Sequence, residues 1–199
     1  DPSDRDLFVM TANQLGFARY LAGDAEGASG FYQRVLELVP DEQEAMRWLG
    51  RIAFESGDEA GALRAVEYFE RLSALYPDDD SAVYYARLSR DRVTFGVAAS
   101  DAFQRGLQLY EAGALEDALA DFRLALVEND DYVDAAVWAG RIELELGRPE
   151  RAVPYWSAVV AARPDDAGAA WFLGVAQTQE RWGVEAGEHH YRGLAAYEN

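Results

Sequence analysis

The adjacent residues His189 and His190 are the only imidazoles in the chain, and they are the side chains best suited to metal binding or proton transfer. Acidic residues precede them at Glu185 and Glu188 on the same predicted helix. Neighbouring residues of a helix point about 100° apart, so both imidazoles cannot easily face one ion, and only Glu185 shares a face with His189. No H-E-x-x-H spacing and no third ligand is nearby in the sequence. We therefore expect a surface pair here, and neither a metal site nor a catalytic site.

Two acidic runs, residues 78–80 and 128–131, have the composition of a calcium-binding loop. They lack the alternating ligand spacing and the central glycine of an EF-hand. Each run precedes a predicted helix, where carboxylates cap exposed amides and complement the helix dipole. The runs therefore predict helix capping in preference to ion binding.

Several classes of chemistry are excluded because their residues are absent from the sequence. The chain has no Cys, which removes disulfides, thiol nucleophiles and thiolate metal sites. All 18 cations are Arg, so Schiff-base catalysis and a phosphate-binding P-loop lysine are excluded too. No Ser, His and Asp set suggests a hydrolase. We expect no cofactor and no enzymatic activity.

The charge balance bears on the partner. Asp and Glu number 36 against those 18 Arg, which gives a formal net charge of −18 at pH 7. Such a field repels nucleic acid and anionic lipid, so a neutral or basic protein or peptide is the expected partner. No apolar run approaches the ~20 residues that span a bilayer, so no membrane insertion is expected. The amino terminus Asp-Pro-Ser-Asp has neither an initiator Met nor a signal sequence, which leaves a cytoplasmic protein and an exported one with its signal removed both open.

A repeat is visible in the glycines that close a helical turn. Gly16, Gly50, Gly106, Gly140 and Gly174 are separated by 34, 56, 34 and 34 residues. A small residue follows twelve positions after three of them, at Ala28, Ala118 and Ala152, and a bulky one four further on, at Tyr32, Phe122 and Trp156. In the second repeat Ala65 and Phe69 come three places late, which we interpret as an insertion in the turn between Gly57 and Ala62.

These landmarks predict helical hairpins that stack on one another. Each phasing Gly should face the Ala of its hairpin and let two backbones approach closely, while the aromatic residue fills the space against the next repeat. Turns are predicted at four glycines, where a helix would end in a left-handed residue: Gly23, Gly57, Gly113 and Gly147.

The period of 34 residues and the Gly, Ala and aromatic landmarks resemble the tetratricopeptide repeat (TPR) family. The resemblance implies an all-α fold, an α-solenoid with a right-handed superhelix, of about five TPR-like hairpins plus one extra helix. Residues 1–93 should form two repeats and a capping helix, and residues 97–199 three more repeats, the last ending in a helix over 184–197. One continuous solenoid is the alternative. The stretch 79–92 reads as a helix, and 93–97 as its continuation or as a bent connection.

The resemblance also implies where a ligand would bind. In TPR arrays the first helix of each hairpin lines the concave face, and its fifth and ninth positions commonly touch the ligand. In this chain these positions are Asn13, Phe17, Arg47, Arg51, Phe103, Leu107, Val137, Arg141, Trp171 and Val175. The arginines could bind carboxylates. Alternatively they could pair along their own helices, because Glu44 lies three before Arg47 and Glu55 four after Arg51.

Three function classes follow from these observations. A scaffold or adaptor that binds a protein or peptide segment in its groove is the leading hypothesis. A structural spacer or self-assembling module is the second, and a homo-oligomer is compatible with it. An enzyme with a site near His189 is the third and the least favoured.

Overall fold

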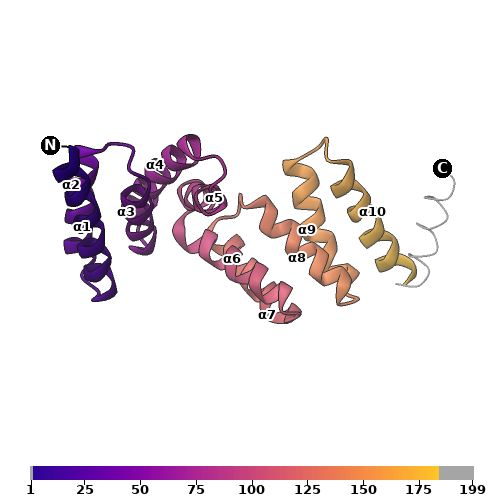
Figure 1. Ribbon diagram of the computed structural model, residues 1–199. Coiled ribbons are helices and arrows are strands. Elements are labelled where there is room, and N and C mark those ends of the chain that lie inside the picture. Colours follow the sequence, from indigo (N-terminus) through magenta and orange to yellow (C-terminus); the bar gives the residue numbers. More distant parts are fainter. Residues whose placement is uncertain (1, 184–199) are drawn as a thin grey trace. The chain divides into compact units, whose positions relative to one another are not determined.

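The computed structural model describes residues 2–183, and this part of the chain consists of ten α-helices without a strand (Figure 1). The predicted all-α fold class is thereby confirmed. The chain divides after Val97 into two compact units, which are described one at a time. The predicted helix over 184–197, with His189 and His190, lies outside the described residues.

The first unit contains two helical hairpins and one further helix. Its elements are α1 (Pro2–Leu21), α2 (Ala25–Leu38), α3 (Gln43–Glu55), α4 (Glu59–Leu75) and α5 (Asp80–Phe95). Each helix packs on the next one along the chain. The helix α5 continues to Phe95 and ends at Gly96, whose φ of 91° is a left-handed value that favours glycine. The stretch 93–97 is therefore mainly a continuation of α5.

The described part of the second unit contains two hairpins and the first helix of another. Its elements are α6 (Val97–Glu111), α7 (Leu115–Glu128), α8 (Val133–Glu145), α9 (Pro149–Ala162) and α10 (Ala167–Trp182). The four hairpin turns of the two units have three residues each, and the predicted turn glycines have φ values between 70° and 79°. The prediction of left-handed turn residues is confirmed.

An aromatic ring lies over each phasing glycine of the four hairpins. A Cβ added at Gly50 would lie 2.9 Å from the Phe69 ring, and one at Gly140 would lie 2.8 Å from the Trp156 ring. The same relation joins Gly16 to Tyr32 and Gly106 to Phe122. The prediction that the glycine faces the Ala of the second helix is therefore wrong, because the ring occupies that space. The Ala residues are instead buried beside it.

The other face of each ring stacks on an aromatic residue of the following hairpin or helix, as predicted. Phe69 stacks on Tyr85 with centroids 5.1 Å apart, and Trp156 stacks on Phe172 at 4.6 Å. The remaining two stacks are Tyr32 on Trp48 at 6.2 Å and Phe122 on Trp138 at 5.8 Å. One ring therefore holds its own hairpin closed and joins it to the next.

The three extra residues of the second repeat lie in a helix. The turn before α4 has the same length as the others, whereas α4 has 17 residues and α2, α7 and α9 have 14 each. The predicted insertion in the turn is therefore wrong. Three residues are close to one helical turn, so Phe69 still faces Gly50. The extra turn fits against α3 because Gly61 has no side chain; a Cβ there would lie 2.3 Å from the Ala53 carbonyl oxygen.

The first acidic run caps α5 as predicted. The Asp79 carboxylate accepts hydrogen bonds from the Ala82 amide at 3.1 Å and from Arg47 Nη2 of α3 at 2.5 Å. Burial alone would raise the pKa of Asp79, but hydrogen bonds from Ser81, Arg47 and Ala82, with the Arg47 charge, hold it well below its usual range. One carboxylate therefore both starts α5 and ties it to α3.

The second acidic run behaves differently. Tyr132 is the N-cap of α8 and makes no side-chain cap bond, while the Asn129 side chain accepts from the Asp131 amide at 3.0 Å within the preceding turn. Capping of α8 by this run is a prediction that the structure contradicts. The Asn129 side chain instead accepts from the backbone amide two residues further along, so it stabilises the turn and not the helix.

Replacing Gly50 with Ala should destabilise the chain, because the new Cβ meets the buried Phe69 ring. Overpacking costs about 1–3 kcal/mol, which outweighs the ~1 kcal/mol that Ala gains over Gly in a helix. Gly30→Ala is the matched control: a Cβ there meets nothing within 4 Å, so this variant should gain about 0.5–1 kcal/mol. Urea denaturation followed by circular dichroism measures both. A Gly50→Ala variant as stable as Gly30→Ala would contradict the role assigned to the ring.

Replacing Asp79 with Asn should lower the free energy of unfolding by about 1 kcal/mol at neutral pH, because the charged bond with the part-exposed Arg47 is lost while Asn still caps α5. The folded-state pKa lies below the unfolded value of about 3.9, so this stabilisation is complete above that pH and is lost as the pH falls towards the folded-state pKa. The difference between the wild type and Asp79→Asn should therefore shrink in acid. The exposed neighbour Asp78→Asn should show neither effect in the same denaturation series.

Candidate functional site

The ten predicted contact residues lie on the five first helices α1, α3, α6, α8 and α10, and three of them are buried. Asn13 is 7% exposed and donates its amide to Glu42 at 3.3 Å. Phe103 is 7% exposed because Tyr132 stacks on it, with centroids 4.7 Å apart. Val175 is also buried. These three side chains belong to the packing between helices, so their assignment as ligand contacts is corrected.

The other predicted residues differ in how much surface they offer. Phe17 is 40% exposed and Trp171 is 49% exposed. Leu107 and Val137 are half-buried. Arg47 is held by Asp79 and not by Glu44, the helical partner considered from the sequence. This leaves Arg51 and Arg141 as the exposed cations of the set.

Arg51 belongs to a cluster of four side chains. The unit-1 cluster is Tyr20, Trp48, Arg51 and Glu55. The Arg51 guanidinium lies 5.8 Å from the centre of the Trp48 ring, and its Nε donates to Glu55 Oε1 at 2.8 Å. The Tyr20 ring packs at a tilt of 52° on Trp48, with centroids 4.8 Å apart, and its hydroxyl donates to Glu55 Oε2 at 2.7 Å. Each member therefore contacts at least two others, and the Arg–Glu pairing considered from the sequence is present.

The second unit repeats this arrangement residue for residue. The unit-2 cluster is Tyr110, Trp138, Arg141 and Glu145. Arg141 lies 5.3 Å from the Trp138 ring and donates Nε to Glu145 at 3.0 Å. Tyr110 packs on Trp138 at 4.8 Å and donates to Glu145 at 2.8 Å. The sequence signal for the clusters is the pattern W-x-G-R-I-x-x-E, which occurs at 48–55 and again at 138–145.

In each cluster the Arg cation and the Tyr hydroxyl both bond the Glu carboxylate. The hydrogen bond to Glu55 raises the pKa of the Tyr20 hydroxyl, and the bond to Glu145 does the same to the pKa of Tyr110. The Glu55 hydrogen bond also raises the pKa of Arg51. Tyrosine therefore stays a neutral donor and arginine a cation throughout the physiological range. Each cluster thus presents a cation, a carboxylate, a neutral phenol and an aromatic ring close together.

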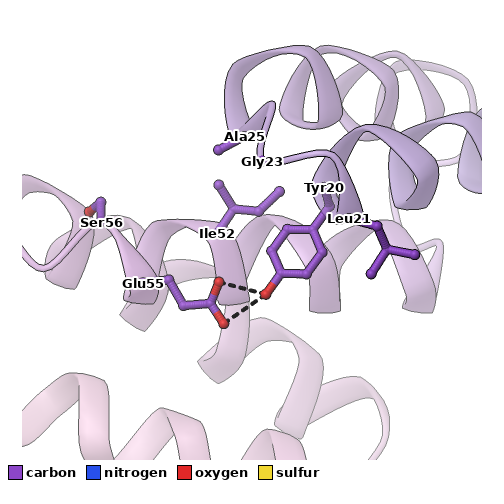
Figure 2. A pocket seen from close by; sticks show the side chains of 7 residues that line it. All are labelled: Tyr20, Leu21, Gly23, Ala25, Ile52, Glu55 and Ser56. Carbon is purple, nitrogen blue, oxygen red and sulfur yellow. Dashed lines mark hydrogen bonds between the residues drawn. The ribbon is translucent and has the colours of Figure 1, made fainter.

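An open depression of about 540 Å³ lies beside the unit-1 cluster, between the first hairpin turn and the end of α3. Figure 2 shows the Tyr20 hydroxyl directed at both oxygens of Glu55 along one side of it. The other lining residues are mainly small or apolar: Leu21, Gly23, Ala25, Ile52 and Ser56. The depression therefore combines an apolar floor with one carboxylate.

The corresponding positions of the second unit carry larger side chains. Counting forward by the 90 residues that separate the two clusters, Leu115 takes the place of Ala25, and Leu146 takes that of Ser56. Both leucines are half-buried. The two units thus share the cluster and differ in the space next to it.

Glu143 is a buried carboxylate that the sequence analysis did not anticipate. It is 0% exposed on α8, and it accepts a hydrogen bond from Arg123 of α7. Arg123 also donates Nε to the Tyr155 hydroxyl of α9 at 2.9 Å. The only sign of this buried Glu143 in the sequence is its place between the apolar residues Ile142 and Leu144. The contacts join three helices, so we assign Glu143 to the architecture of the second unit.

No three His, Cys, Asp or Glu side chains come together as a potential metal site within residues 2–183. In the same range, no helix combines the length and the apolar character needed to cross a membrane.

Comparison with solved structures finds helical-repeat proteins of low identity. MamA is 19% identical, with 96% of this chain and 92% of that chain covered and a TM-score of 0.39. TTC0263 from Thermus thermophilus, a thermophilic TPR protein, is 22% identical, with coverage of 85% and 98% and a TM-score of 0.38. YrrB, described as a TPR protein with an unusual peptide-binding site, is 18% identical, with coverage of 80% and 89% and a TM-score of 0.40.

Among curated proteins, the Protein CTR9 homolog of Arabidopsis thaliana is 25% identical over 187 residues. The match covers 83% of this chain but only 17% of that much longer relative. The sequence model of the tetratricopeptide repeat matches residues 15–67 and 138–199, which together are more than half of the chain. The first segment contains Gly16 and the Tyr32 ring over it, and the second contains Gly140 and the Trp156 ring over it. The chain belongs to the tetratricopeptide repeat family.

Proposed function

We propose that the chain is a protein-interaction scaffold in which the cluster of each unit binds an extended or helical segment of a neutral or basic partner. The tetratricopeptide fold supports an interaction role, and proteins of this family are generally scaffolds and not catalysts. The observation that carries the finer proposal is the duplication of one Tyr–Trp–Arg–Glu cluster, with exposed Arg and Glu and half-buried rings, on the first helices of consecutive hairpins in each unit. The repeat architecture that the two units share explains the phasing glycines and the central rings. It does not require the same Tyr, Trp, Arg and Glu at the equivalent positions of both units.

The clusters favour binding because their side chains are already ordered. Arg51 and Arg141 are each fixed by a carboxylate and a Trp ring, so little side-chain freedom is lost when a ligand docks. Trp, Tyr and Arg are also the residues that dominate binding energy at protein interfaces. Side chains of Arg and Glu in one cluster offer donors and acceptors together, which suits the polar main chain of a peptide.

The charge of the whole chain favours a basic partner during encounter. The net charge of −18 attracts cations over the Debye length, whereas the clusters act at contact distance. Phe103 is left out of the proposed contact residues, since it lies in the core. Phe17 and Trp171 remain as exposed aromatic residues on the first helices, with Val137 between them in the sequence.

The depression beside the unit-1 cluster supplies a place for one side chain of the partner. Its apolar floor suits an aliphatic stem, and the Glu55 carboxylate beside it suits a cationic head. An Arg or Lys of the partner combines both features. The first unit is therefore proposed to bind a basic segment.

Substitutions in the clusters should weaken peptide binding. Peptides selected from a random library on the immobilised chain serve as ligands, and calorimetry measures their affinity. Arg51→Ala, Arg141→Ala and Trp171→Ala should each weaken binding several-fold, because each removes a preordered or exposed anchor while the helices stay intact. Raised salt should slow association more than it speeds dissociation.

Two substitutions on α4 serve as matched controls. Arg64 and Leu63 are exposed on α4, which contributes no side chain to either cluster, so Arg64→Ala and Leu63→Ala should leave affinity unchanged. Circular dichroism checks that all variants keep their helical content. If the selected peptides bind the cluster variants as tightly as the wild type, the proposed site is wrong.

Filling the depression should weaken binding of basic peptides without affecting the fold. Ala25→Leu and Ser56→Leu together give the first unit the side chains that the second unit carries at these positions. The pair should reduce the affinity several-fold, since the partner's side chain loses its place. Gln33→Leu adds the same side chain at an exposed position of α2 outside the depression and should bind normally. Unchanged affinity in the filled variant would remove the depression from the proposal.

A further inference from the structure

One face of α1 carries an uncovered apolar stripe. Its residues follow the alternating three- and four-residue spacing of a helix seam, and Ala22 in the following turn continues that spacing; we call the set the α1 stripe: Asp4, Phe8, Thr11, Leu15, Ala18 and Ala22. Phe8 is 39% exposed and Leu15 is 46% exposed. The remaining members are exposed as well. The stripe is distinct from the side of α1 that bears Phe17 and Tyr20.

The same face is covered on α3. The residues of α3 equivalent to Thr11, Leu15 and Ala18 are Ala45, Leu49 and Ile52, 34 positions later. They pack in one core cluster with Tyr32 and Val35 of the preceding α2. This is the face through which one hairpin receives another helix. On α1 it is apolar and has no helix against it in the described part of the chain.

The first helix of the second unit shows that an apolar stripe is not a requirement of the position. Moving 90 residues forward from Thr11, Leu15 and Ala18 gives Asp101, Arg105 and Gln108 on α6. Arg105 bonds Asp121 at 2.9 Å. An exposed apolar face invites association, and a polar face such as that of α6 does not.

We propose that the α1 stripe is a self-association surface, on which the α1 helix of a second copy of this chain packs antiparallel. This inference concerns a different face from the proposed peptide site, and either can fail without the other. An antiparallel pair is isologous, so every contact occurs twice.

Side-chain size supports a second copy as the occupant. In an antiparallel seam of this spacing, Phe8 lies over Ala18 of the partner copy and Leu15 lies over Thr11. Each bulky residue therefore meets a small one, which is the alternation that lets two helices interdigitate. A parallel pair would instead place Phe8 against Phe8 and Ala18 against Ala18.

Charge supports the same orientation. Asp4 lies in the first turn of α1 and Arg19 in its last turn, next to the stripe. Antiparallel packing brings the acidic end of one helix to the basic end of the other, where the two side chains are within reach. Arg19 also bonds Asp24 of its own hairpin at 3.1 Å, so Asp24 is kept in every variant.

The first test is the mass of the full chain by light scattering and sedimentation over a concentration series. The wild type should be a reversible dimer, and Leu15→Glu should raise its dissociation constant at least tenfold, since the charge enters the seam twice. Leu63→Glu, at an exposed apolar position of α4, should dimerise normally. A monomer at all concentrations would overturn the proposal, and so would a dimer that tolerates Leu15→Glu. The monomer result would assign the stripe to another protein or to a further repeat.

A charge exchange tests the orientation. Asp4→Arg and Arg19→Asp should each weaken the dimer about tenfold, because each places like charges together at both ends. The double variant Asp4→Arg/Arg19→Asp restores opposite charges and should recover the wild-type dissociation constant to within about twofold. Failure of the double variant to recover would rule out the antiparallel pairing.

Cysteine trapping gives a second measure of the register, which the absence of native Cys makes simple. Thr11→Cys and Leu15→Cys are made as separate chains and oxidised alone and mixed. A disulfide needs Cα atoms about 4.4–6.8 Å apart, so the mixture should crosslink several-fold more than either chain alone. Val127→Cys, which replaces an 80% exposed residue on α7, is the control for random collision. Equal crosslinking in all samples would count against the proposal.

Discussion

The ring at the centre of each second helix is in contact on both sides, with a bare glycine backbone on one and an aromatic residue of the following helix on the other. This double contact explains why glycine is needed at the phasing position, where propensity alone would favour alanine. It also explains why Tyr, Phe and Trp all serve, since the requirement is a flat apolar surface that a helix backbone can approach. Helix lengths, turn lengths and the extra turn of α4 are all compatible with this contact, and none of them disturbs it.

The Trp residues of the two clusters connect the surface side chains to these central rings. Trp48 and Trp138 stack on the central rings with one face, and their other surroundings include Arg and Tyr. Each cluster thus lies next to the stacked rings that hold the hairpins of its own unit together. A ligand that engages them would contact side chains whose positions are fixed by the core, which is the condition for a well-defined site on a repeat protein.

The repeat and its architecture could be predicted from the sequence because glycine, alanine and aromatic residues recur with one period and each has a steric reason to do so. The turn glycines are confirmed for the same reason. The position of the insertion could not be predicted, because three residues look alike in a turn and in a helix until the contact of Gly61 with α3 is known. Exposure was harder still: Asn13, Phe103 and Val175 occupy ligand-facing positions in the family pattern, yet Glu42, Tyr132 and neighbouring core residues cover or engage them here. The four-residue clusters involve pairs 35 residues apart, which a search for local motifs does not combine.

The central rings contact residues only 16 to 19 positions away on either side, and this has a consequence for how the chain folds. Loops that short close at little entropic cost, and a chain dominated by such contacts forms them early. Within a unit, either hairpin can serve as the nucleus, after which the neighbouring helix gains an aromatic surface to fold against. Each unit is thus able to assemble in either direction along its own part of the chain.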